Sequence, residues 1–159
     1  MPEKIDVAAE FEAHGDAVYN HCFRRSGDWS TAEELTSAVF LHAWGRRDSA
    51  LLVDGSALPW LLGIANNVLR NHARMLRRRV LALGRRAPDP PHTEDHCDEI
   101  ASRVDDERRM RQILPLLRQL PIREQDIVTL VFWSGLSYEE TARALSIPVG
   151  TVRSRLARA

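Results

Sequence analysis

Five side chains near the C-terminus have the chemistry needed to bind nucleic acid. Arginine guanidinium groups bind phosphates and guanine edges, and hydroxyl groups bind phosphates or bases. No acidic residue follows Glu140, so no carboxylate between 141 and 159 repels a phosphate backbone. The five candidates are Thr151, Arg153, Ser154, Arg155 and Arg158.

The surrounding pattern predicts a helix-turn-helix unit that positions these side chains. Ser137 can cap the first helix, and Glu140 stands three residues later, as a capping box requires. Pro148 suits the first turn of the second helix. The expected buried seam contains Ala142, Leu145, Ile147, Val152 and Leu156. The second helix of such a unit lies in the DNA major groove, whereas the alternative is a helical hairpin with solvated arginines.

Charge is segregated along the chain although the net charge is zero. Seven arginines and no acidic residue lie between Arg70 and Arg86, and eight acidic residues with one arginine lie between Asp89 and Glu107. Charge runs are commonly only solvated faces. A basic block, an acidic block and a basic C-terminus also fit two DNA-facing parts joined by an acidic connector.

Apolar residues recur at helical spacing and no segment alternates as a strand, so we expect an all-α fold. The predicted helices cover about 7–25, a segment from Ser30 or Thr31 to about 46, and then 57–83, 104–119 and 123–134, before the helix-turn-helix. Two small helical domains are expected, with an acidic, proline-rich linker between them. The expected core residues of the first three helices include Phe11, Val18, Tyr19, Cys22, Phe23, Leu35, Val39, Phe40, Ala43, Trp44, Trp60, Leu61, Ile64, Ala65, Val68 and Leu69.

Three stretches resemble parts of the extracytoplasmic-function (group 4) sigma factors of the sigma-70 family. STAEELTSAVFLHAW (30–44) resembles region 2.2, and PWLLGIANNVLRNHARMLRRR (59–79) resembles regions 2.3 and 2.4. The stretch 120–156 resembles region 4, and also the output domain of response regulators, which would open with alternating strands and helices that are absent here. The resemblance implies region 2 at 7–86, a linker at 87–103 and region 4 at 104–159.

The resemblance implies a transcription initiation factor that is not an enzyme. Such a protein binds core RNA polymerase through the β′ clamp and the β flap, directs it to promoter DNA with −10 and −35 elements, and helps to open the DNA. An anti-sigma factor is a further implied partner. The alternatives are a helix-turn-helix regulator that acts without polymerase, and a module that chiefly docks an anti-sigma regulator.

The resemblance also implies roles for individual residues. Ser154 and Arg158 would contact base edges of the −35 element. Thr151, Arg153 and Arg155 would contact phosphates. The −10 candidates are Asn66, Asn67, Arg70, Asn71, Arg74 and Arg77, and Asn67 with the preceding loop would form a pocket for a flipped base. Candidates for polymerase contact are Glu33, Glu34, Leu35, Ser37, Ala38 and Leu41.

Three positions depart from the family pattern. The family often has a Gln-Glu pair where this chain has Ser37-Ala38, which favours a polymerase contact that is weaker or differently arranged. Gly63 replaces a commonly basic residue, which removes a phosphate contact. Ser146 stands where glycine is common in the turn, so a positive φ there would carry some strain.

Several classes of protein are disfavoured by the sequence. The only cysteines, Cys22 and Cys97, do not form a disulfide framework, which fits a reducing compartment and a cytoplasmic location. His92, His96 and Cys97 lack the number and spacing of metal ligands, so neither a metal nor another cofactor is expected. The N-terminus is too polar for a signal peptide, and no apolar run reaches the ~18 residues of a membrane span.

Overall fold

The computed structural model describes residues 4–84 and 97–159, with only the backbone of residues 97–100 described. Its regular elements are helical, which confirms the all-α fold class, and its β structure is an isolated bridge between Val53 and Ser56. The elements are α1 (Val7–Ser26), α2 (Trp29–Gly45), η1 (Arg47–Ser49), α3 (Leu58–Leu83), α4 (Cys97–Leu117), α5 (Ile122–Val128), η2 (Thr129–Trp133), α6 (Tyr138–Leu145) and α7 (Val149–Arg158).

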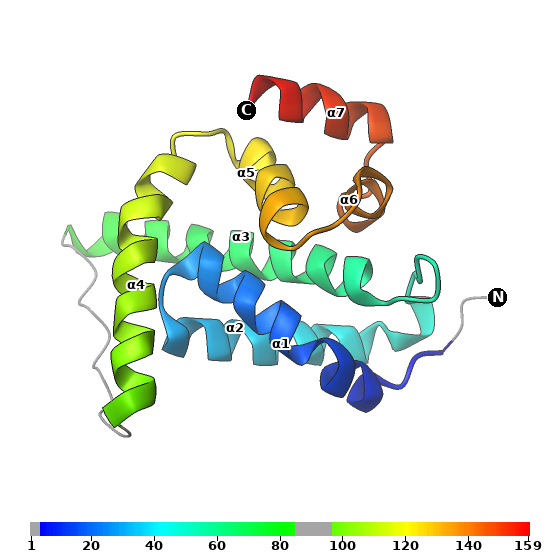
Figure 1. The fold of residues 1–159 in the computed structure, drawn as a ribbon, viewed down its shortest axis with the longest axis horizontal. Coiled ribbons are helices and arrows are strands. Elements are labelled where there is room, and N and C mark those ends of the chain that lie inside the picture. The colour runs from blue at the N-terminus through cyan, green and yellow to red at the C-terminus, as the bar shows by residue number, and fades with distance from the viewer. Residues whose placement is uncertain (1–3, 85–96) are drawn as a thin grey trace.

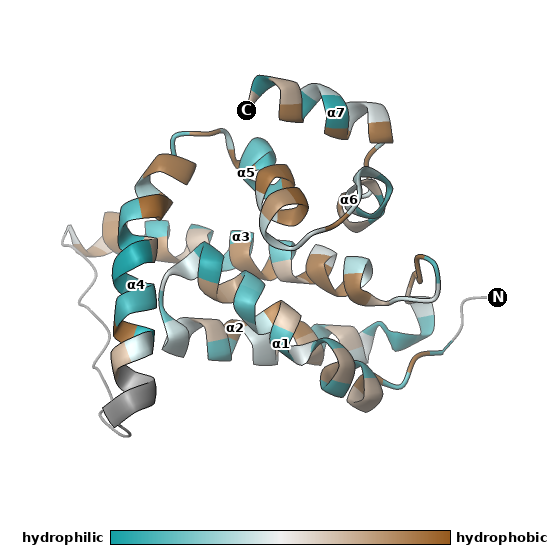
Figure 2. Ribbon diagram, in the orientation of Figure 1, coloured by the Kyte–Doolittle hydropathy of each residue, from teal (hydrophilic) through white to brown (hydrophobic). Residues whose placement is uncertain are grey.

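Helices α1, α2 and α3 pack against one another as a bundle (Figure 1). The predicted spacing of apolar residues places Val18, Val39 and Leu61 in its centre, where each is fully buried. Each full burial of such a side chain contributes about 1.5–3 kcal/mol. Brown, hydrophobic segments of these ribbons accordingly turn toward their neighbours, and teal segments turn outward (Figure 2).

The predicted start of α2 was wrong by about two residues. We expected Ser30 or Thr31 to cap it, but Asp28 is the N-cap. The Asp28 carboxylate accepts from the Thr31 backbone N–H at 2.7 Å and from its hydroxyl at 2.6 Å. The aspartate accepts from a backbone N–H that would otherwise lack a partner. Its negative charge also interacts favourably with the positive end of the helix dipole, so the helix begins at Trp29.

Two expected core residues are exposed instead. Trp44 is 55% exposed and Phe11 is 53% exposed. Trp44 follows the core periodicity from Phe40, but α2 ends at Gly45, and the indole lies 4.8 Å from the Arg47 guanidinium carbon. The Phe11 ring rests edge-on against Phe40, with 4.9 Å between the centroids, and leaves its outer side open.

The C-terminal helix pair matches the prediction closely. Ser137 caps α6 with a complete capping box, in which the Ser137 N–H donates to Glu140 at 2.7 Å and the Glu140 N–H donates to Ser137 at 3.1 Å. Ser146 ends α6 with a φ of 53°, the left-handed conformation that glycine adopts more easily. Val152 is fully buried against Ile127 and Ala142, and the other seam residues pack around them.

Helices α4 and α5 differ from their predicted bounds. α4 begins at Cys97, inside the stretch predicted as linker, rather than near residue 104. The expected helix 123–134 is divided into α5 and the π-helical turn η2. Such turns widen the helix locally and often occur at functional sites. The division of the chain into domains at 87 and 104 remains a prediction.

The C-terminal helices lie directly on the N-terminal bundle, with α6 packed against α3 (Figure 1). Leu130 and Leu136 belong to the same buried cluster as the bundle residues Leu61 and Leu62. Gly63 is the point of closest approach, because a Cβ there would overlap the backbone carbonyl oxygen of Ala144. Gly63 therefore permits a contact between two parts of the chain that the sequence pattern treated separately.

In the part of the chain that the structure describes, no helix combines the length and the hydropathy needed to cross a membrane.

Candidate nucleic-acid interface

Helix α7 presents its polar candidates away from its buried side. Arg153, Ser154 and Arg158 are exposed, while Thr151 and Arg155 are half-buried. The Ser154 hydroxyl donates to the Thr151 carbonyl at 3.2 Å, and Arg158 Nε donates to the Ser154 carbonyl at 3.3 Å. These bonds hold two side chains along the helix, and the remaining guanidinium donors of Arg158 can still reach a ligand.

The −10 candidates on α3 are divided between two faces of the helix. Asn67, Asn71, Arg74 and Arg77 are exposed. Asn66 is only 2% exposed, and the Arg70 side chain is 37% exposed. Helical periodicity explains the division, because residues 66 and 70 are one turn apart and face the C-terminal helices. The structure thus groups four of the six candidates on an open surface and turns two inward.

A cavity of about 250 Å³ lies beside Asn67. Its N-terminal wall comes from the loop before α3 and from the start of α3, with Trp60 and Ile64 among the lining side chains. Its opposite wall comes from α6 and the following turn, through Arg143, Ala144 and Ser146. A cavity with an amide, an aromatic side chain and apolar walls can hold a nucleobase.

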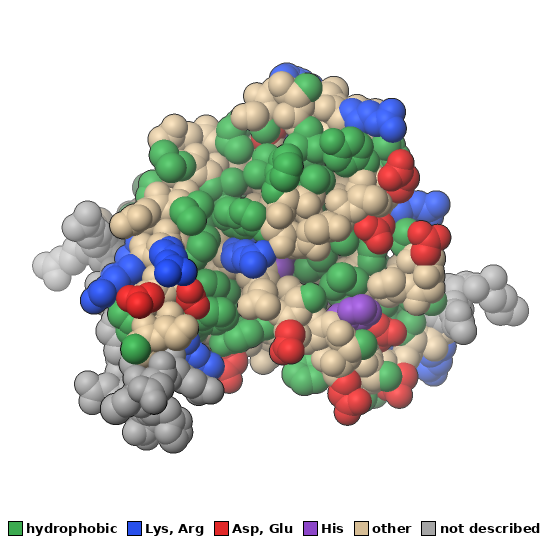
Figure 3. All heavy atoms as spheres, in the orientation of Figure 1, with side chains coloured by type: hydrophobic (Ala, Val, Ile, Leu, Met, Phe, Trp, Pro, Cys, Tyr) green, Lys and Arg blue, Asp and Glu red, His purple; other side chains and the backbone are tan. Residues whose placement is uncertain are grey.

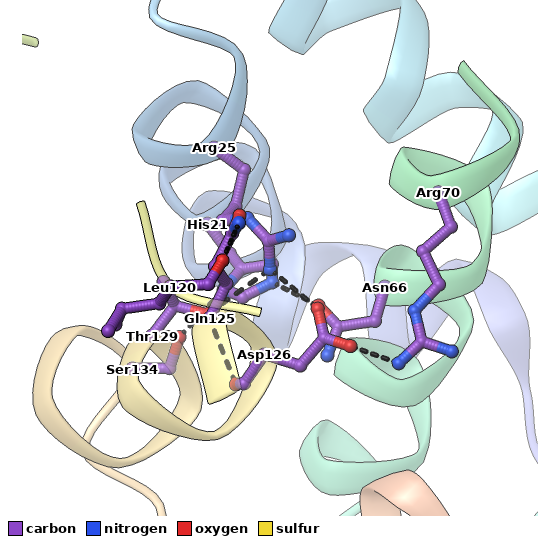
Figure 4. A network of polar contacts seen from close by, with 9 residues as sticks. All are labelled: His21, Arg25, Asn66, Arg70, Leu120, Gln125, Asp126, Thr129 and Ser134. Atoms are coloured by element: carbon purple, nitrogen blue, oxygen red, sulfur yellow. Dashed lines mark hydrogen bonds and ion pairs between the residues drawn. The ribbon is translucent and has the colours of Figure 1, made fainter. Parts of the chain in front are cut away.

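A polar network links α1 and α3 to α5 and the turn η2 (Figure 4). One ring nitrogen of His21, Nε2, lies 2.8 Å from the Asn66 amide oxygen. The other, Nδ1, lies 2.9 Å from the Ser134 hydroxyl. A neutral imidazole with its proton on Nε2 satisfies both contacts, because Nε2 then donates to Asn66 and Nδ1 accepts from Ser134. His21 therefore joins helices that are far apart in sequence.

Burial controls the charge of His21. Desolvation lowers the pKa of His21 to about 4, and the positive charge of Arg25 also lowers it, while the hydrogen bond to Asn66 opposes the change. The imidazole is fully buried, so its protonated form has no water to solvate it. His21 is neutral at pH 7 and serves as a hydrogen-bonding bridge.

The structure should lose stability as pH falls from 6.5 to 4, because His21 binds a proton more weakly when buried. A folded-state pKa below the unfolded value of 6.5 means that the stabilisation is present above pH 6.5 and is lost as pH falls through 4. The expected loss between pH 7 and pH 5 is about 2 kcal/mol. Urea unfolding at the two pH values measures it, and His21→Gln should flatten the difference between them. An equal pH dependence in both proteins would contradict the assignment.

Asp126 carries the most fully buried charge of this network. Its carboxylate is completely inaccessible and pairs with Arg25 at 2.9 Å on one oxygen and with Arg70 on the other. Figure 4 shows the carboxylate lying between α1 and α3, held from both sides. Removal of one member of a buried charge group typically costs about 3–5 kcal/mol, because the remaining charge loses its partner.

Two donors of the network have no hydrogen-bond partner among the described residues. They are the Asn66 amide nitrogen Nδ2 and Arg70 Nε, both buried. A buried donor left unsatisfied costs about 1–3 kcal/mol. The same two side chains were predicted to contact DNA, and each retains a donor that a base or phosphate would satisfy.

The polymerase candidates lie on α2. Glu33, Glu34, Ser37 and Leu41 are exposed, and Ala38 is half-buried. Leu35 is buried in the core, so its side chain does not belong to the surface. Leu41 is 74% exposed. Trp44 lies three residues further along the helix and is exposed as well, although its spacing predicts a core position.

Exposed apolar side chains also occur on α5 and η2. Ile122 is 42% exposed and Phe132 is 69% exposed. In Figure 3, hydrophobic side chains gather over α5 and below α7 on the viewed face. The acidic linker, with His92 and His96, lies outside the described residues, and so do the side chain of Cys97 and the expected linker contacts.

Family models match two parts of the chain. The model described as "Sigma-70 region 2" matches residues 11–79, and the one described as "Sigma-70, region 4" matches residues 110–159. The first contains α3 with its −10 candidates, and the second contains the helix-turn-helix.

Curated relatives carry related names. The chain is 32% identical over 128 residues to the RNA polymerase sigma factor HrpL of Pseudomonas syringae pv. syringae, which covers 80% of this chain and 68% of the relative. It is 35% identical over 134 residues to the ECF RNA polymerase sigma factor SigC of Mycobacterium tuberculosis, covering 83% and 68%. It is 30% identical over 144 residues to the ECF RNA polymerase sigma factor BldN of Streptomyces coelicolor, covering 91% of this chain but 53% of the relative.

Two solved structures share the fold. CnrH in complex with the cytosolic domain of CnrY matches with a TM-score of 0.66 at 20% identity, over 96% of this chain and 81% of that one. The sigma factor RpoE of Bartonella quintana, in complex with the anti-sigma factor NepR, matches with a TM-score of 0.66 at 22% identity, over 95% and 89%. At these identities the likeness concerns the arrangement of the helices.

Proposed function

We propose specific roles for the two DNA-facing surfaces of this chain, which belongs to the ECF RNA polymerase sigma factors. A sigma factor directs RNA polymerase to promoters and is not itself an enzyme. The proposed division of labour rests on one observation: exposed basic or amide side chains occur on two separate helices, α3 and α7. One helix serves the −10 element and the other serves the −35 element.

Helix α7 reads the −35 element from the major groove. Ser154 and Arg158 contact base edges, while Thr151, Arg153 and Arg155 contact phosphates. The exposure of Arg153, Ser154 and Arg158 and the burial of Val152 on the opposite side support this orientation. The first helix of the unit, α6, then crosses the DNA backbone, as in other helix-turn-helix proteins.

Arg158→Ala should weaken −35 binding at one base position. A bidentate arginine contact to a base is worth about 1–3 kcal/mol of discrimination, so the preference at that position should fall about 5–150-fold. Binding measured on duplexes with each base at each −35 position tests this. Arg153→Ala is the matched control, because loss of a phosphate contact should weaken all sequences alike. A uniform loss for Arg158→Ala would reassign that residue to phosphate contact.

Helix α3 recognises the −10 element during strand opening. Asn67 lies in the cavity with Trp60 and Ile64, where a base extruded from the non-template strand would find an amide and apolar walls. Asn71, Arg74 and Arg77 continue along the open face and contact the adjoining backbone. Asn66 and Arg70 also belong to this surface, because each has a side-chain N–H donor that a base or a phosphate can satisfy.

Helix α2 binds the β′ clamp of core polymerase. Glu33, Glu34 and Ser37 offer polar contacts, and Leu41 offers an exposed apolar one. Ala38 lies at the margin, and Leu35 supports the helix from below. We add Trp44 to this surface because it is exposed beyond Leu41. The exposed Ile122 and Phe132 of α5 and η2 suit contact with the β flap.

An anti-sigma factor is a further proposed partner, because RpoE was solved in complex with the anti-sigma factor NepR. The chain would act in the cytoplasm, where bacterial RNA polymerase works. A fully buried Cys22, whose pKa burial raises to about 11, is an unreactive core residue and imposes no redox requirement.

Run-off transcription with purified core polymerase and a promoter library tests the proposed function. The expected result is a set of transcripts that core polymerase alone does not produce. Specific duplex binding without any effect on polymerase would favour the plain helix-turn-helix regulator. Tight binding of a protein partner, with no transcription after its removal, would favour the docking module.

A further inference from the structure

We propose that the free chain is autoinhibited: its C-terminal helices close over the inward side of the −10 surface of α3, where Asn66 and Arg70 lie, and the Asp126 carboxylate latches this closed state. The inference rests on the proposed function of α3. It concerns the chain acting on itself and needs no regulatory partner.

The latch consists of Asp126 and its two arginine partners, and it connects the C-terminal helices to the N-terminal bundle. Among the described residues, the side-chain partners of Asp126 are Arg25 on α1 and Arg70 on α3, both outside the C-terminal helices. Its carboxylate is fully buried, and the Arg25 side chain is 7% exposed. A buried charge whose only partners lie across the interface contributes to closure and not to the internal stability of α5, α6 and α7.

Closure engages the two −10 candidates that face inward, Asn66 and Arg70, and leaves the other four exposed. Arg143, Ala144 and Ser146 form one wall of the cavity that contains Asn67. Arg70 is engaged by Asp126, and Asn66 is held by His21, which Ser134 contacts from the C-terminal part. While Ala144 rests against Gly63, α6 blocks the path between the two helices to Asn66 and Arg70, although the cavity beside Asn67 stays accessible. The closed chain therefore cannot use its −10 surface fully.

The exposed face of α7 stays available in the same state. Arg153, Ser154 and Arg158 are all open to solvent. Closure thus affects the two activities differently, since the −35 face of α7 stays open while two −10 side chains are engaged and −10 binding is weakened. This asymmetry gives the proposal a readout that a general loss of folding would not produce.

Two buried donors at the interface favour the opening of the closed state. Asn66 Nδ2 and Arg70 Nε are buried and have no partner among the residues that the structure describes, which weakens the interface that contains them. Opening exposes both donors to water, or to the bases and phosphates of a promoter. Single-stranded −10 DNA should therefore compete with Asp126 for Arg70 and shift the chain toward the open state.

Asp126→Asn tests the latch in the full chain. The change keeps the side-chain shape and removes the charge, so the ratio of closed to open chain should fall by roughly 100-fold or more. Small-angle X-ray scattering should give a radius of gyration of about 15 Å for the compact wild type and a larger value for the variant. Asp105→Asn is the control, because this exposed acid pairs only at the surface with Arg108.

Two DNA-binding measurements complete the experiment. A single-stranded −10 oligonucleotide should bind Asp126→Asn at least about tenfold more tightly than wild type, while a −35 duplex binds both equally. Unchanged scattering and unchanged −10 binding in Asp126→Asn would overturn the latch. Loss of −35 binding would mean that the C-terminal helices had unfolded, in which case Arg25→Gln, on the opposite side of the pair, provides the same test.

The latch and the proposed function can fail independently. If wild type directs promoter-specific transcription but Asp126→Asn leaves closure unchanged, the latch is wrong and the function stands. If Asp126→Asn opens the chain but neither protein directs transcription, the closed state is real and the proposed function is wrong.

Discussion

Replacement of Gly63 by arginine is expected to abolish the closed form of the free chain. Even a Cβ at this position would overlap the Ala144 carbonyl, which belongs to the backbone of α6 and cannot rotate away. Helix α6 would have to withdraw, and the buried pairing of Asp126 with Arg25 would be lost with it. Loss of that pairing alone corresponds to about 3–5 kcal/mol, or a change of more than 100-fold in the closed population.

Scattering by the free protein and transcription with core polymerase measure this effect together. Gly63→Arg should be extended in solution and should still direct promoter-specific transcription, because an arginine on α3 can contact the phosphates of the −10 strand. Gly45→Arg is the matched control, since a Cβ at Gly45 would have no heavy atom of the described residues within 4 Å. A compact Gly63→Arg protein would show that closure does not depend on the close approach of α6 to residue 63.

Asn67→Ala is expected to slow promoter opening with little effect on −35 binding. Its amide is the polar group that α3 contributes to the cavity, and a well-placed amide contact to a base is worth about 1–3 kcal/mol. Open-complex formation should therefore slow by about ten- to a hundredfold. Permanganate reactivity of unpaired thymines follows opening, and a −35 duplex titration should change less than about twofold.

Asn20→Ala provides the control for this substitution. Asn20 is an exposed asparagine on α1, outside the proposed DNA surfaces, so its replacement should leave opening and −35 binding unchanged. If Asn67→Ala weakened both steps equally, Asn67 would not belong to a flipped-base pocket.

The helix-turn-helix was predictable because its determinants are local. Ser137 and Glu140 form their capping box within one turn, and Val152 is buried by the periodicity of its own helix. Asp28 could have been identified as a cap as well, since aspartate is among the preferred N-cap residues. Ser30 and Thr31 follow Asp28 within three residues and are also preferred N-cap residues, so the local sequence alone does not select Asp28.

The closed interface could not be predicted in the same way. Asp126 pairs with a residue 101 positions earlier, and no periodic pattern connects the two. The sequence indicates only that Gly63 lacks a phosphate contact. In the structure, the absence of a side chain at Gly63 allows α6 to approach α3. Trp44 was assigned to the core by spacing alone, and only the end of α2 at Gly45 reveals why it is exposed.

Transcription as a function of promoter spacing tests the central claim most directly. If α7 and α3 read two elements of one duplex, the elements must lie at a fixed separation and on a fixed face of the DNA. The insertion of about 5 base pairs between them, roughly half a helical turn, should abolish transcription, and about 10 base pairs should not restore it fully. Equal transcription at all spacings would contradict the account, because a single-element reader would not sense the distance.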